Sequence, residues 1–457
     1  MSRVNLEEIN VGVENSAMEF TIQSVMDNDT PVNDYKMMQE FGIWTVDVLF
    51  RNENLKRFLS DVNQNFDAVI VDLYESEIYS GLAALYDCPM IWVYSMGAHW
   101  QPLRLIDEPT NPAYTTDYLS KNVFPSSFQQ RVEELWAQIR WTWYKCTNTL
   151  PKEKQLYQNF FGPLFERRGR SLPDYEELIY NASLILANDH HSFGNTPKTP
   201  QNFKFVGGQH IENPVKPLPL ELQTLMDNAK HGVIYFSMGS TWTSKSFPKT
   251  IIEGLLEVFR ELNQTVIWKF EEDLPNSPSN VKIVKWAPQQ SILAHPNCVL
   301  FISHGGLLSS TESVHFGVPV IGIPIYHDQF INTQKAAAKR YAILVPLNYD
   351  MPDNLRIAIH TMLHDPVYKQ KVEELSNIYH DRPVSPAKEA VHWIEHVIRT
   401  NGAPHLRSPA LHMPFYQKFY LDLLALIVAF ILVLYKTTAF VAKASNTKRV
   451  LQKGKKN

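Results

Sequence analysis

Cysteine is scarce in this sequence of 457 residues, which contains only Cys88, Cys146 and Cys298. Their spacing matches no metal-binding motif. Cys298 opens an apolar run and is therefore predicted to be buried, while a disulfide between Cys88 and Cys146 stays an open alternative.

A basic surface is also lacking over most of the chain. The formal net charge is −4, yet every charged residue after position 435 is basic, seven in all. Without these seven positive charges the remaining chain carries a net charge of −11. Because binding to nucleic acid needs a basic face, such an acidic body argues against that class of function.

The N-terminal segment lacks the apolar run of a secretory signal. Residues Met1 to Glu8 are largely polar, so no signal peptide is expected in the printed chain. This absence conflicts with the membrane signals at the C-terminal end. We expect one cause for the conflict, a sequence that begins downstream of its natural start.

The longest apolar run lies near the C-terminus and is unbroken from Leu423 to Tyr435. A helix needs about 20 residues to cross a bilayer, and the region 415–435 has that length. A buried core helix is the alternative, but a basic segment on one side only is typical of the cytosolic side of a membrane span. We therefore expect a transmembrane helix at 415–435, a basic cytosolic tail at 436–457 and a body in a lumen.

Two weaker signals point to the endoplasmic reticulum. The last residues, Lys453 to Asn457, resemble a dilysine retrieval signal of that membrane. Sequons for N-glycosylation begin at Asn28, Asn181 and Asn263, which suits lumenal loops. Together they predict a single-pass glycoprotein of the endoplasmic reticulum membrane.

Strand-like and helix-like segments alternate along the body of the chain. Short apolar runs end at polar residues, and the alternation becomes regular from 232 to 323. Near-continuous apolar strands separated by helices predict parallel sheets covered on both faces. A Pro-rich stretch after Gly208 is typical of a linker. We therefore predict an α/β protein of two doubly wound domains facing a cleft, with domains at 1–206 and 207–400 and a connector at 401–414.

A glycine turn between a strand and a helix is the most informative local feature. A strand is predicted to end at Ser303, His304-Gly305-Gly306 follows, and a helix begins near Leu308. Glycine lets the backbone approach a bound group, and a helix N-terminus offers free N–H groups and a partial positive charge. Such a turn suits a phosphate, although a plain structural turn is the alternative.

The longer segment from Trp286 to Gln329 favours the phosphate site. It contains Trp286-Ala-Pro-Gln-Gln, the His-Gly-Gly turn followed by Glu312, and Pro-Ile-Tyr-His-Asp-Gln at its end. This segment strongly resembles the signature of the UDP-glycosyltransferase family, in its membrane-bound, insect-like animal branch. Further similar motifs lie at 205–208, 235–240, 393–397 and 405–407, and the resemblance runs from about position 63 to the tail. It implies two Rossmann-like domains of the GT-B type and transfer of a sugar from a UDP-sugar.

The resemblance implies a role for each matching residue at the nucleoside end. Trp286 would stack on uracil, an interaction that contributes about 1–3 kcal/mol in nucleotide sites. Gln289 and Glu312 would bind the ribose, because a carboxylate can accept hydrogen bonds from two neighbouring hydroxyls. The alternatives are a core tryptophan at a strand end and a glutamate on a solvated helix face.

The same resemblance implies the phosphate and sugar contacts. Asp328 and Gln329 would bind hydroxyls of the donor sugar, and a helix cap is the structural alternative for Asp328. Leu308 departs from relatives that carry an amide there, which removes one expected phosphate hydrogen bond. The residues implied to bind the diphosphate are Ser240, His304, Gly305, Gly306 and Ser309.

No metal ion or cofactor is expected, because the UDP-sugar is a co-substrate. The family's mechanism is direct displacement with inversion, in which helix dipole and hydrogen-bond donors stabilise the leaving UDP. The histidines that could suggest a metal fit no ligand spacing; they are His295, His304, His315 and His327.

The general base is the weakest part of the prediction. In the family it is a histidine paired with an aspartate, and Asp72, at the end of its strand, matches the aspartate. An ordinary turn residue is the alternative. No histidine precedes Asp72, so the partner seen in the family is expected to be absent from the printed chain. His99 follows Asp72 and is predicted to serve packing or the acceptor pocket.

Three hypotheses for the activity stay open. The first is transfer of a sugar, glucose rather than glucuronate, to a hydroxyl of a small lipophilic acceptor. The second is a truncated, non-catalytic UDP-binding partner that forms oligomers with full-length relatives. The third, another nucleotide-sugar enzyme such as an epimerase, is disfavoured by the apolar segment and basic tail. An apolar, ring-bearing acceptor is suggested by Trp92, Trp100, Trp141 and Trp143.

Overall fold

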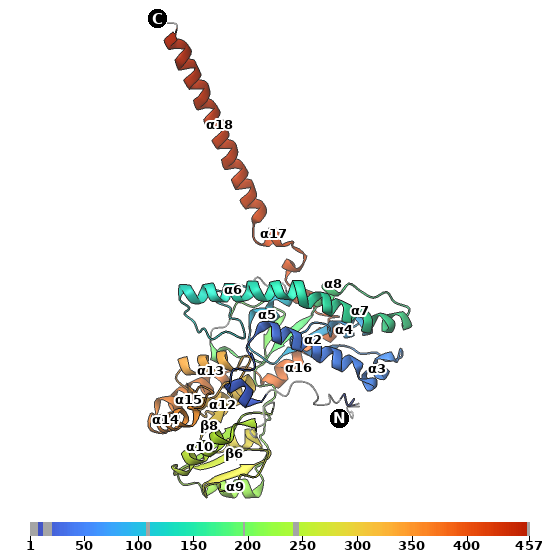
Figure 1. Cartoon of the computed structure of the whole chain (residues 1–457). Coiled ribbons are helices and arrows are strands. Elements are labelled where there is room, and N and C mark those ends of the chain that lie inside the picture. The colour runs from blue at the N-terminus through green and yellow to red at the C-terminus, as the bar shows by residue number, and fades with distance from the viewer. Residues whose placement is uncertain (1–7, 12–20, 107–109, 195–196, 241–245, 455–457) are drawn as a thin grey trace. The chain divides into compact units, whose positions relative to one another are not determined.

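The structure is a computed structural model that describes residues 8–11, 21–106, 110–194, 197–240 and 246–454 (Figure 1). Most of the polar N-terminal segment and the end of the dilysine-like tail, 455–457, lie outside the described residues. The chain divides into two units, of which one ends at Arg407 and the other begins at Ser408.

The first sheet has four parallel strands in the order β1-β2-β3-β4. Its central strands are apolar and almost wholly buried, as expected for a sheet covered on both faces, whereas β1 is an edge strand with Ile70 46% exposed. Among the described strands the order does not reverse, so the doubly wound pattern predicted for this domain is not seen there. The strands are β1 (Val69–Asp72), β2 (Met90–Tyr94), β3 (Leu184–Ala187) and β4 (Phe203–Phe205).

Helices cover this sheet, and most of them lie before β1 or between β2 and β3. Asp34 caps α2, and Ser127 and Gln130 form a capping box that starts α6. A single π-helical turn, Lys145–Thr149, joins α6 to α7. These helices are α2 (Tyr35–Arg51), α3 (Glu53–Ser60), α4 (Ser80–Tyr86), α5 (Trp100–Leu103), α6 (Phe128–Tyr144), α7 (Leu150–Arg167) and α8 (Tyr175–Ile179).

The second sheet has six parallel strands in the order β10-β9-β8-β5-β6-β7. The chain winds outward from β5 in one direction and then returns to build the other side from β8, which is the doubly wound pattern predicted for this part. Its strands are β5 (Val233–Ser237), β6 (Thr265–Lys269), β7 (Val281–Val284), β8 (Cys298–Ser303), β9 (Val320–Gly322) and β10 (Ala342–Leu344).

Helices flank both faces of the second sheet. Two apolar clusters of buried residues lie on its faces, one under α10 and α14 and the other under α12 and α15. The helices are α9 (Leu220–Asp227), α10 (Lys249–Arg260), α11 (Gln289–Leu293), α12 (Leu307–Phe316), α13 (Gln329–Ala338), α14 (Met351–His364) and α15 (Val367–His380).

Two helices pack on the sheet that is distant from them in sequence. Helix α1 (Ile22–Met26) precedes the first sheet, yet Ile22 and Met26 are buried in the apolar core of the second. Helix α16 (Pro386–Arg399) follows the second sheet, yet Ala390 and Val397 pack against strands of the first. Each core is therefore completed by a segment that sequence order would assign to the other domain.

The three cysteines are unpaired, and Cys298 is buried as predicted. Cys146 is exposed and Cys88 is partly buried, so the alternative of a bridge between them is not realised.

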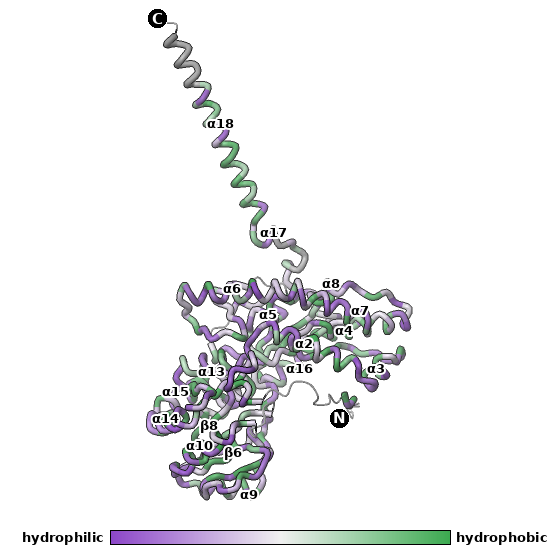
Figure 2. The backbone as a smooth tube through the Cα atoms, viewed as in Figure 1, coloured by the Kyte–Doolittle hydropathy of each residue, from purple (hydrophilic) through white to green (hydrophobic). Residues whose placement is uncertain are grey.

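The second unit contains α17 (Phe415–Lys418) and α18 (Leu421–Gly454). The residues Leu421–Ala444 form a helical stretch of 24 residues with mean hydropathy 2.3, long and apolar enough to cross a membrane (Figure 2). This stretch starts later than the predicted 415–435, because Tyr420 has a φ of 55° that separates α17 from α18. It also ends later, so that Lys436 lies within the helix.

Candidate functional site

A pocket of about 320 Å³ opens beside the point where the second sheet reverses its order, between β5 and β8. In open α/β sheets, ligands bind beyond the carboxyl ends of the strands at such a point. Six of the residues predicted to bind UDP line this pocket together. They are Ser240, Trp286, Gln289, His304, Gly306 and Ser309.

The imidazole of His304 is held between two glycines. A Cβ at Gly239 would lie 2.7 Å from His304 Cε1, and a Cβ at Gly306 would lie 2.5 Å from Nε2. Both distances are shorter than real Cβ contacts, so a side chain at either position would displace the imidazole. Gly239 also has a φ of 82°, which other residues rarely adopt.

His304 is neutral and has a free ring nitrogen. Burial lowers the pKa of His304 to about 4, with a smaller opposing effect from Asp328. Among the described residues, Nδ1 has no hydrogen-bond partner although it is buried. A buried polar atom without a partner is costly, and Nδ1 is shielded inside the protein, so contact with a ligand is left to the part of the His304 ring that lines the pocket.

The third glycine of the turn acts through conformation and does not line the pocket. Gly305 has a φ of 82°, and a Cβ there would lie 2.2 Å from Thr333 Oγ1. It thereby allows Gly306 to stand at the N-cap of α12, where no side chain caps the helix. The first N–H groups of α12 therefore lack a side-chain cap and can donate hydrogen bonds to an anionic ligand.

Glu312 is buried and tied into a polar network. Gln289 Nε2 donates to Glu312 Oε2 over 2.5 Å, and Gln290 Nε2 donates to Oε1 over 3.0 Å. His210 Nε2 lies 3.3 Å from the same Oε1. Gln289 Nε2 also donates to Ser309 Oγ, so the network reaches the pocket wall. A solvated helix face, the alternative for Glu312, is therefore excluded.

Trp286 is 74% exposed at the pocket, which excludes the alternative of a core tryptophan. The Lys269 ammonium lies 5.6 Å from the centre of the Trp286 ring and donates to the Gly239 carbonyl over 3.0 Å. Lys269 was not predicted as a site residue from the sequence. A lysine at the carboxyl end of an otherwise apolar strand, Thr265–Lys269, is the signal that could have pointed to it. It brings a positive charge to the pocket, paired with Glu271.

Asp328 and Gln329 lie outside the residues that line this pocket. Gln329 Oε1 accepts hydrogen bonds from the backbone N–H groups of Ile325 and Tyr326 and so fixes the preceding loop. Asp328 stands at the N-cap position of α13, but its side chain makes no capping bond and instead accepts from Asn332 Nδ2. The Asp328 side chain therefore does not cap α13, which rules out the structural alternative for this residue.

His327 joins this loop to the first sheet. Its Nε2 lies 3.1 Å from Glu75 Oε1, which follows β1, and its backbone N–H donates to Asn33 Oδ1. Burial by itself would lower the pKa of His327, but Asp328 and Glu75 together raise it to about 9. Both His327 and Glu75 have a positive φ, of 60° and 55°, which is uncommon outside glycine. This ion pair links the loops that flank the two sheets.

The pKa of His327 predicts a loss of stability at high pH. The pKa of His327 in the folded chain is about 9, above the value near 6.5 of an unfolded histidine. The contribution of this ion pair to the free energy of unfolding is therefore complete below about pH 6.5 and is lost as the pH rises through 9. Glu75→Gln should flatten this decline in thermal denaturation midpoint, measured on the complete chain. Glu261→Gln, which removes an exposed partner of Arg356, serves as the control. An unchanged slope in Glu75→Gln would contradict the assignment.

Asp72 lies at the carboxyl end of β1, where Ser95 Oγ donates to its Oδ1 over 3.0 Å. Burial raises the pKa of Asp72, and the hydrogen bonds from Ser95 oppose the rise. In the described part of the chain no histidine is hydrogen-bonded to Asp72. His99 is fully buried near Tyr118, and burial lowers its pKa to about 3.

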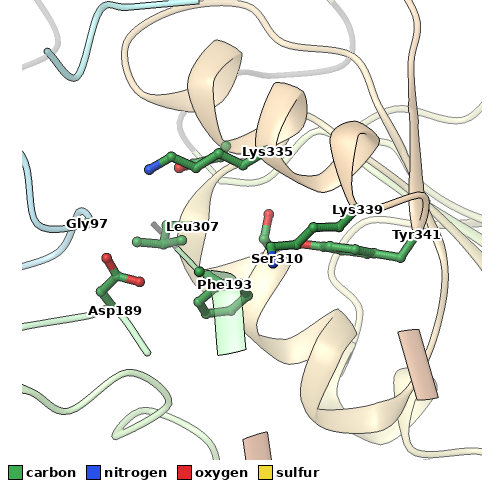
Figure 3. Close-up of a pocket in the computed structure, with 10 residues that line it drawn as sticks. Gly97, Asp189, Phe193, Leu307, Ser310, Lys335, Lys339 and Tyr341 are labelled. Atoms are coloured by element: carbon green, nitrogen blue, oxygen red, sulfur yellow. The ribbon is translucent and has the colours of Figure 1, made fainter. Parts of the chain in front are cut away.

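A second, much smaller pocket lies between loops of the first sheet and α12 and α13 (Figure 3). Lys335 and Asp189 extend towards it from opposite sides. Burial lowers the pKa of Lys335, while the charge of Asp189 opposes that shift. With about 20 Å³ it holds no more than a water molecule, so it is not a nucleotide site.

Two parallel α/β sheets with a pocket at the switch point of the second define the fold of a GT-B glycosyltransferase. Solved glycosyltransferases share it. The glycotransferase of kitacinnamycin aligns with a TM-score of 0.52 at 18% identity, covering 78% of this chain and 83% of that chain. The calicheamicin glycosyltransferase CalG4 aligns with a TM-score of 0.52 at 17% identity, covering 77% and 80%. Such low identities show the fold alone.

The chain belongs to the family described as UDP-glucoronosyl and UDP-glucosyl transferase, which it matches over residues 4–457. It is 33% identical to UDP-glucosyltransferase 2 of Dactylopius coccus over 96% of this chain and 83% of the relative. It is 29% identical to UDP-glucuronosyltransferase 2B10 of Homo sapiens over 85% of this chain and 73% of the relative. The resemblance noted in the sequence is thus confirmed, and the protein is a UDP-glycosyltransferase.

Proposed function

We propose that the protein transfers glucose from UDP-glucose to a hydroxyl of a small lipophilic acceptor. The observation that carries the proposal is the pocket at the switch point of the second sheet, which gathers six residues predicted to bind UDP. Glucose is preferred to glucuronate as the donor sugar because the insect relative at 33% identity is named a glucosyltransferase. The human relative at 29% identity is named a glucuronosyltransferase, which makes glucuronate the competing donor.

In this proposal UDP lies along the pocket from Trp286 to the start of α12. The exposed Trp286 ring stacks on uracil, and Glu312 with Gln289 receives the ribose. The diphosphate lies against the free N–H groups of α12 and the ring of His304. Ser240, Gly306 and Ser309 line the same end, and Lys269 adds a charge that favours an anion. Asp328 and Gln329 would face the sugar once the donor is bound.

The chemistry proposed is direct displacement with inversion at the anomeric carbon. The acceptor oxygen forms the new bond, the bond to the β-phosphate oxygen breaks, and the electron pair leaves with UDP. The uncapped start of α12 stabilises the charge that develops on the leaving phosphate, so the step needs no metal ion. Asp72, which has no hydrogen-bonded histidine among the described residues, takes up the acceptor proton itself.

The proposed location is the membrane of the endoplasmic reticulum. The apolar stretch Leu421–Ala444 spans the bilayer once, with the body in the lumen and the basic end of the chain in the cytosol. A lipophilic acceptor dissolves in the same bilayer, which fits a membrane-anchored enzyme.

A donor comparison tests the proposal. The complete chain in microsomes should turn over phenolic acceptors faster with UDP-glucose than with UDP-glucuronate at equal concentrations. Preference for UDP-glucuronate would reverse the donor assignment, while binding of UDP without turnover of either donor would favour the non-catalytic alternative.

Replacement of Trp286 by alanine should weaken UDP binding by about 1–3 kcal/mol, because the stack on the base is lost. Trp286→Phe keeps an aromatic face and should lose less. Ile357→Ala removes a side chain that is 65% exposed on α14 and should leave the UDP affinity unchanged. The measurement is titration calorimetry with UDP, and equal affinity of Trp286→Ala and the parent protein would place the base elsewhere.

A further inference from the structure

Glu75 and His327 form a buried contact between the loop that follows β1 and the loop that precedes α13. His327 Nε2 lies 3.1 Å from Glu75 Oε1, and the side chains of His327 and Glu75 are only 6% and 4% exposed. Taking two charges out of water costs free energy, and their mutual attraction often does no more than offset that cost. Stability alone therefore does not explain why this pair is buried here.

Both residues are held in a backbone conformation that side chains rarely adopt. The φ angle is 55° at Glu75 and 60° at His327. Such conformations cost free energy, persist only where surrounding contacts enforce them, and cluster at functional sites. The enforcing contacts are present. A Cβ at Gly42 of α2 would lie 2.7 Å from the Cβ of Glu75, so α2 packs directly on that loop. The backbone N–H of His327 donates to Asn33 Oδ1 over 3.0 Å.

The orientation of the His327 imidazole is fixed by rings as well as by Glu75. The centre of the Tyr118 ring lies 4.4 Å from that of the imidazole, and the centre of the Tyr74 ring lies 5.7 Å from it. Tyr74 directly precedes Glu75, and Tyr118 precedes α6, so both belong to loops of the first sheet. The imidazole belongs to the loops of the second sheet by sequence but takes its orientation from the first.

A line of polar contacts continues from His327 to the glycine turn of the UDP pocket. His327 Nδ1, the ring nitrogen that does not face Glu75, lies 3.8 Å from Asp328 Oδ1. Asp328 Oδ2 accepts a hydrogen bond from Asn332 Nδ2 over 2.8 Å. The same Asn332 Nδ2 donates to the carbonyl of Gly305 over 3.3 Å. The position of the Asp328 carboxylate is therefore set from one side by Glu75 through His327 and from the other by the turn.

We propose that Glu75 and His327 are positioning residues for sugar transfer, which hold the Asp328 carboxylate on the donor sugar in alignment with Asp72 at the end of β1. This inference rests on the proposed function, in which Asp328 binds the sugar and Asp72 takes up the acceptor proton. Glu75 follows Asp72 by three positions, so one short segment carries both the base and the anchor of the sugar-binding loop. Neither Glu75 nor His327 touches the sugar; both act through Asp328.

The test separates binding of the sugar from binding of the nucleotide. Glu75→Gln and His327→Asn are made in the complete chain, and asparagine is chosen because it tolerates a positive φ better than most residues. Calorimetry without acceptor measures the Kd of UDP, UDP-glucose and UDP-glucuronate, and a steady-state assay with a phenolic acceptor measures kcat. The UDP pocket does not contain the pair, so the Kd of UDP should stay at the parent value in both variants.

Both single variants should bind the preferred UDP-sugar severalfold more weakly than the parent does. Their kcat should fall by about 10²-fold, because a misplacement of about 1 Å can cost that much. The double variant should lose no more than either single variant, since two residues that act through one contact are not additive. Glu75→Asp keeps a carboxylate and should recover part of kcat.

A second buried pair provides the control for loss of stability. Glu153→Gln breaks the contact of Glu153 with Lys145, whose atoms lie 2.8 Å apart in the first unit. Like the variants of Glu75 and His327, it leaves a buried charge without its partner and should lower the thermal denaturation midpoint. The ratio of the Kd of UDP-sugar to the Kd of UDP should not change.

The proposal is overturned if the single variants keep the parent's ratio of Kd values, or if their losses add up in the double variant. An equal change of this ratio in Glu153→Gln would also overturn it, because the effect would then follow from destabilisation in general. Failure of the proposed function gives a different result. A parent protein that turns over neither UDP-glucose nor UDP-glucuronate would refute the transferase activity and this inference together, whereas an active parent with unaffected single variants would refute this inference alone.

Discussion

Asp72→Asn is expected to lower kcat by about 10²–10⁴-fold, which corresponds to about 3–5 kcal/mol of barrier. The substitution removes the carboxylate that takes up the proton of the acceptor hydroxyl. It does not change the UDP pocket, which lies on the second sheet. UDP affinity should therefore stay at the parent value. Asp67→Asn is the control for structural damage to β1. Asp67 is exposed and lies just before the first residue of this strand, at the end opposite Asp72. Turnover of Asp72→Asn equal to that of the parent would remove Asp72 from the chemistry.

The pH profile gives an independent check on the same residue. Ser95 Oγ donates to the ionised carboxylate and so favours it, against the effect of burial. Ser95→Ala should raise the pKa of Asp72 further and move the acid limb of kcat/KM to higher pH. An acid limb at the same pH would mean that another group controls the rate.

Glu312→Ala should produce the largest loss of UDP affinity in the pocket. A hydrogen bond to a charged acceptor contributes about 1.5–3 kcal/mol, and two ribose hydroxyls would each lose one. The variant also leaves the amides of Gln289 and Gln290 without their buried acceptor, so the thermal denaturation midpoint should fall. Calorimetry with UDP and thermal denaturation measure the two effects.

Two further variants separate binding from stability. Glu312→Gln keeps the volume and one acceptor oxygen, so it should fold like the parent and still bind UDP weakly. Glu373→Ala removes an exposed glutamate paired with Lys369 on α15 and should change neither quantity. A folded Glu312→Gln variant with unchanged UDP affinity would show that the ribose does not contact this carboxylate.

The sequence was most informative where one short segment carries both structure and chemistry. The strand, glycine turn and helix around His304 are local, so their order could be predicted, and the helix begins at Leu307 beside the expected position. Strand β8 ends at Ser303 as predicted, because the apolar run that Cys298 opens continues unbroken to that serine. Strand β10 was not predicted, although it lies within the apolar run Tyr341 to Val345.

Contacts between distant segments could not be predicted from the sequence. His210 and Gln290 both approach Glu312, yet His210 lies in the Pro-rich linker and nothing local marks it as a partner. The ion pair between Glu75 and His327 likewise joins residues from different sheets. Burial, exposure and partners decided between the alternatives for Trp286 and Glu312, and these properties exist only in the folded chain.

The exchange of α1 and α16 between the two sheets bears on how new specificities could be engineered. A chimera that joins the first half of one relative to the second half of another at the linker would place Ile22 and Met26 in a foreign core. It would also lay a foreign α16 on the first sheet, where Ala390 and Val397 must fit. Functional hybrids should therefore take residues 386–407 from the parent of the first half and match α1 to the parent of the second. In evolution, the same constraint would couple changes in these short helices to changes in the distant core.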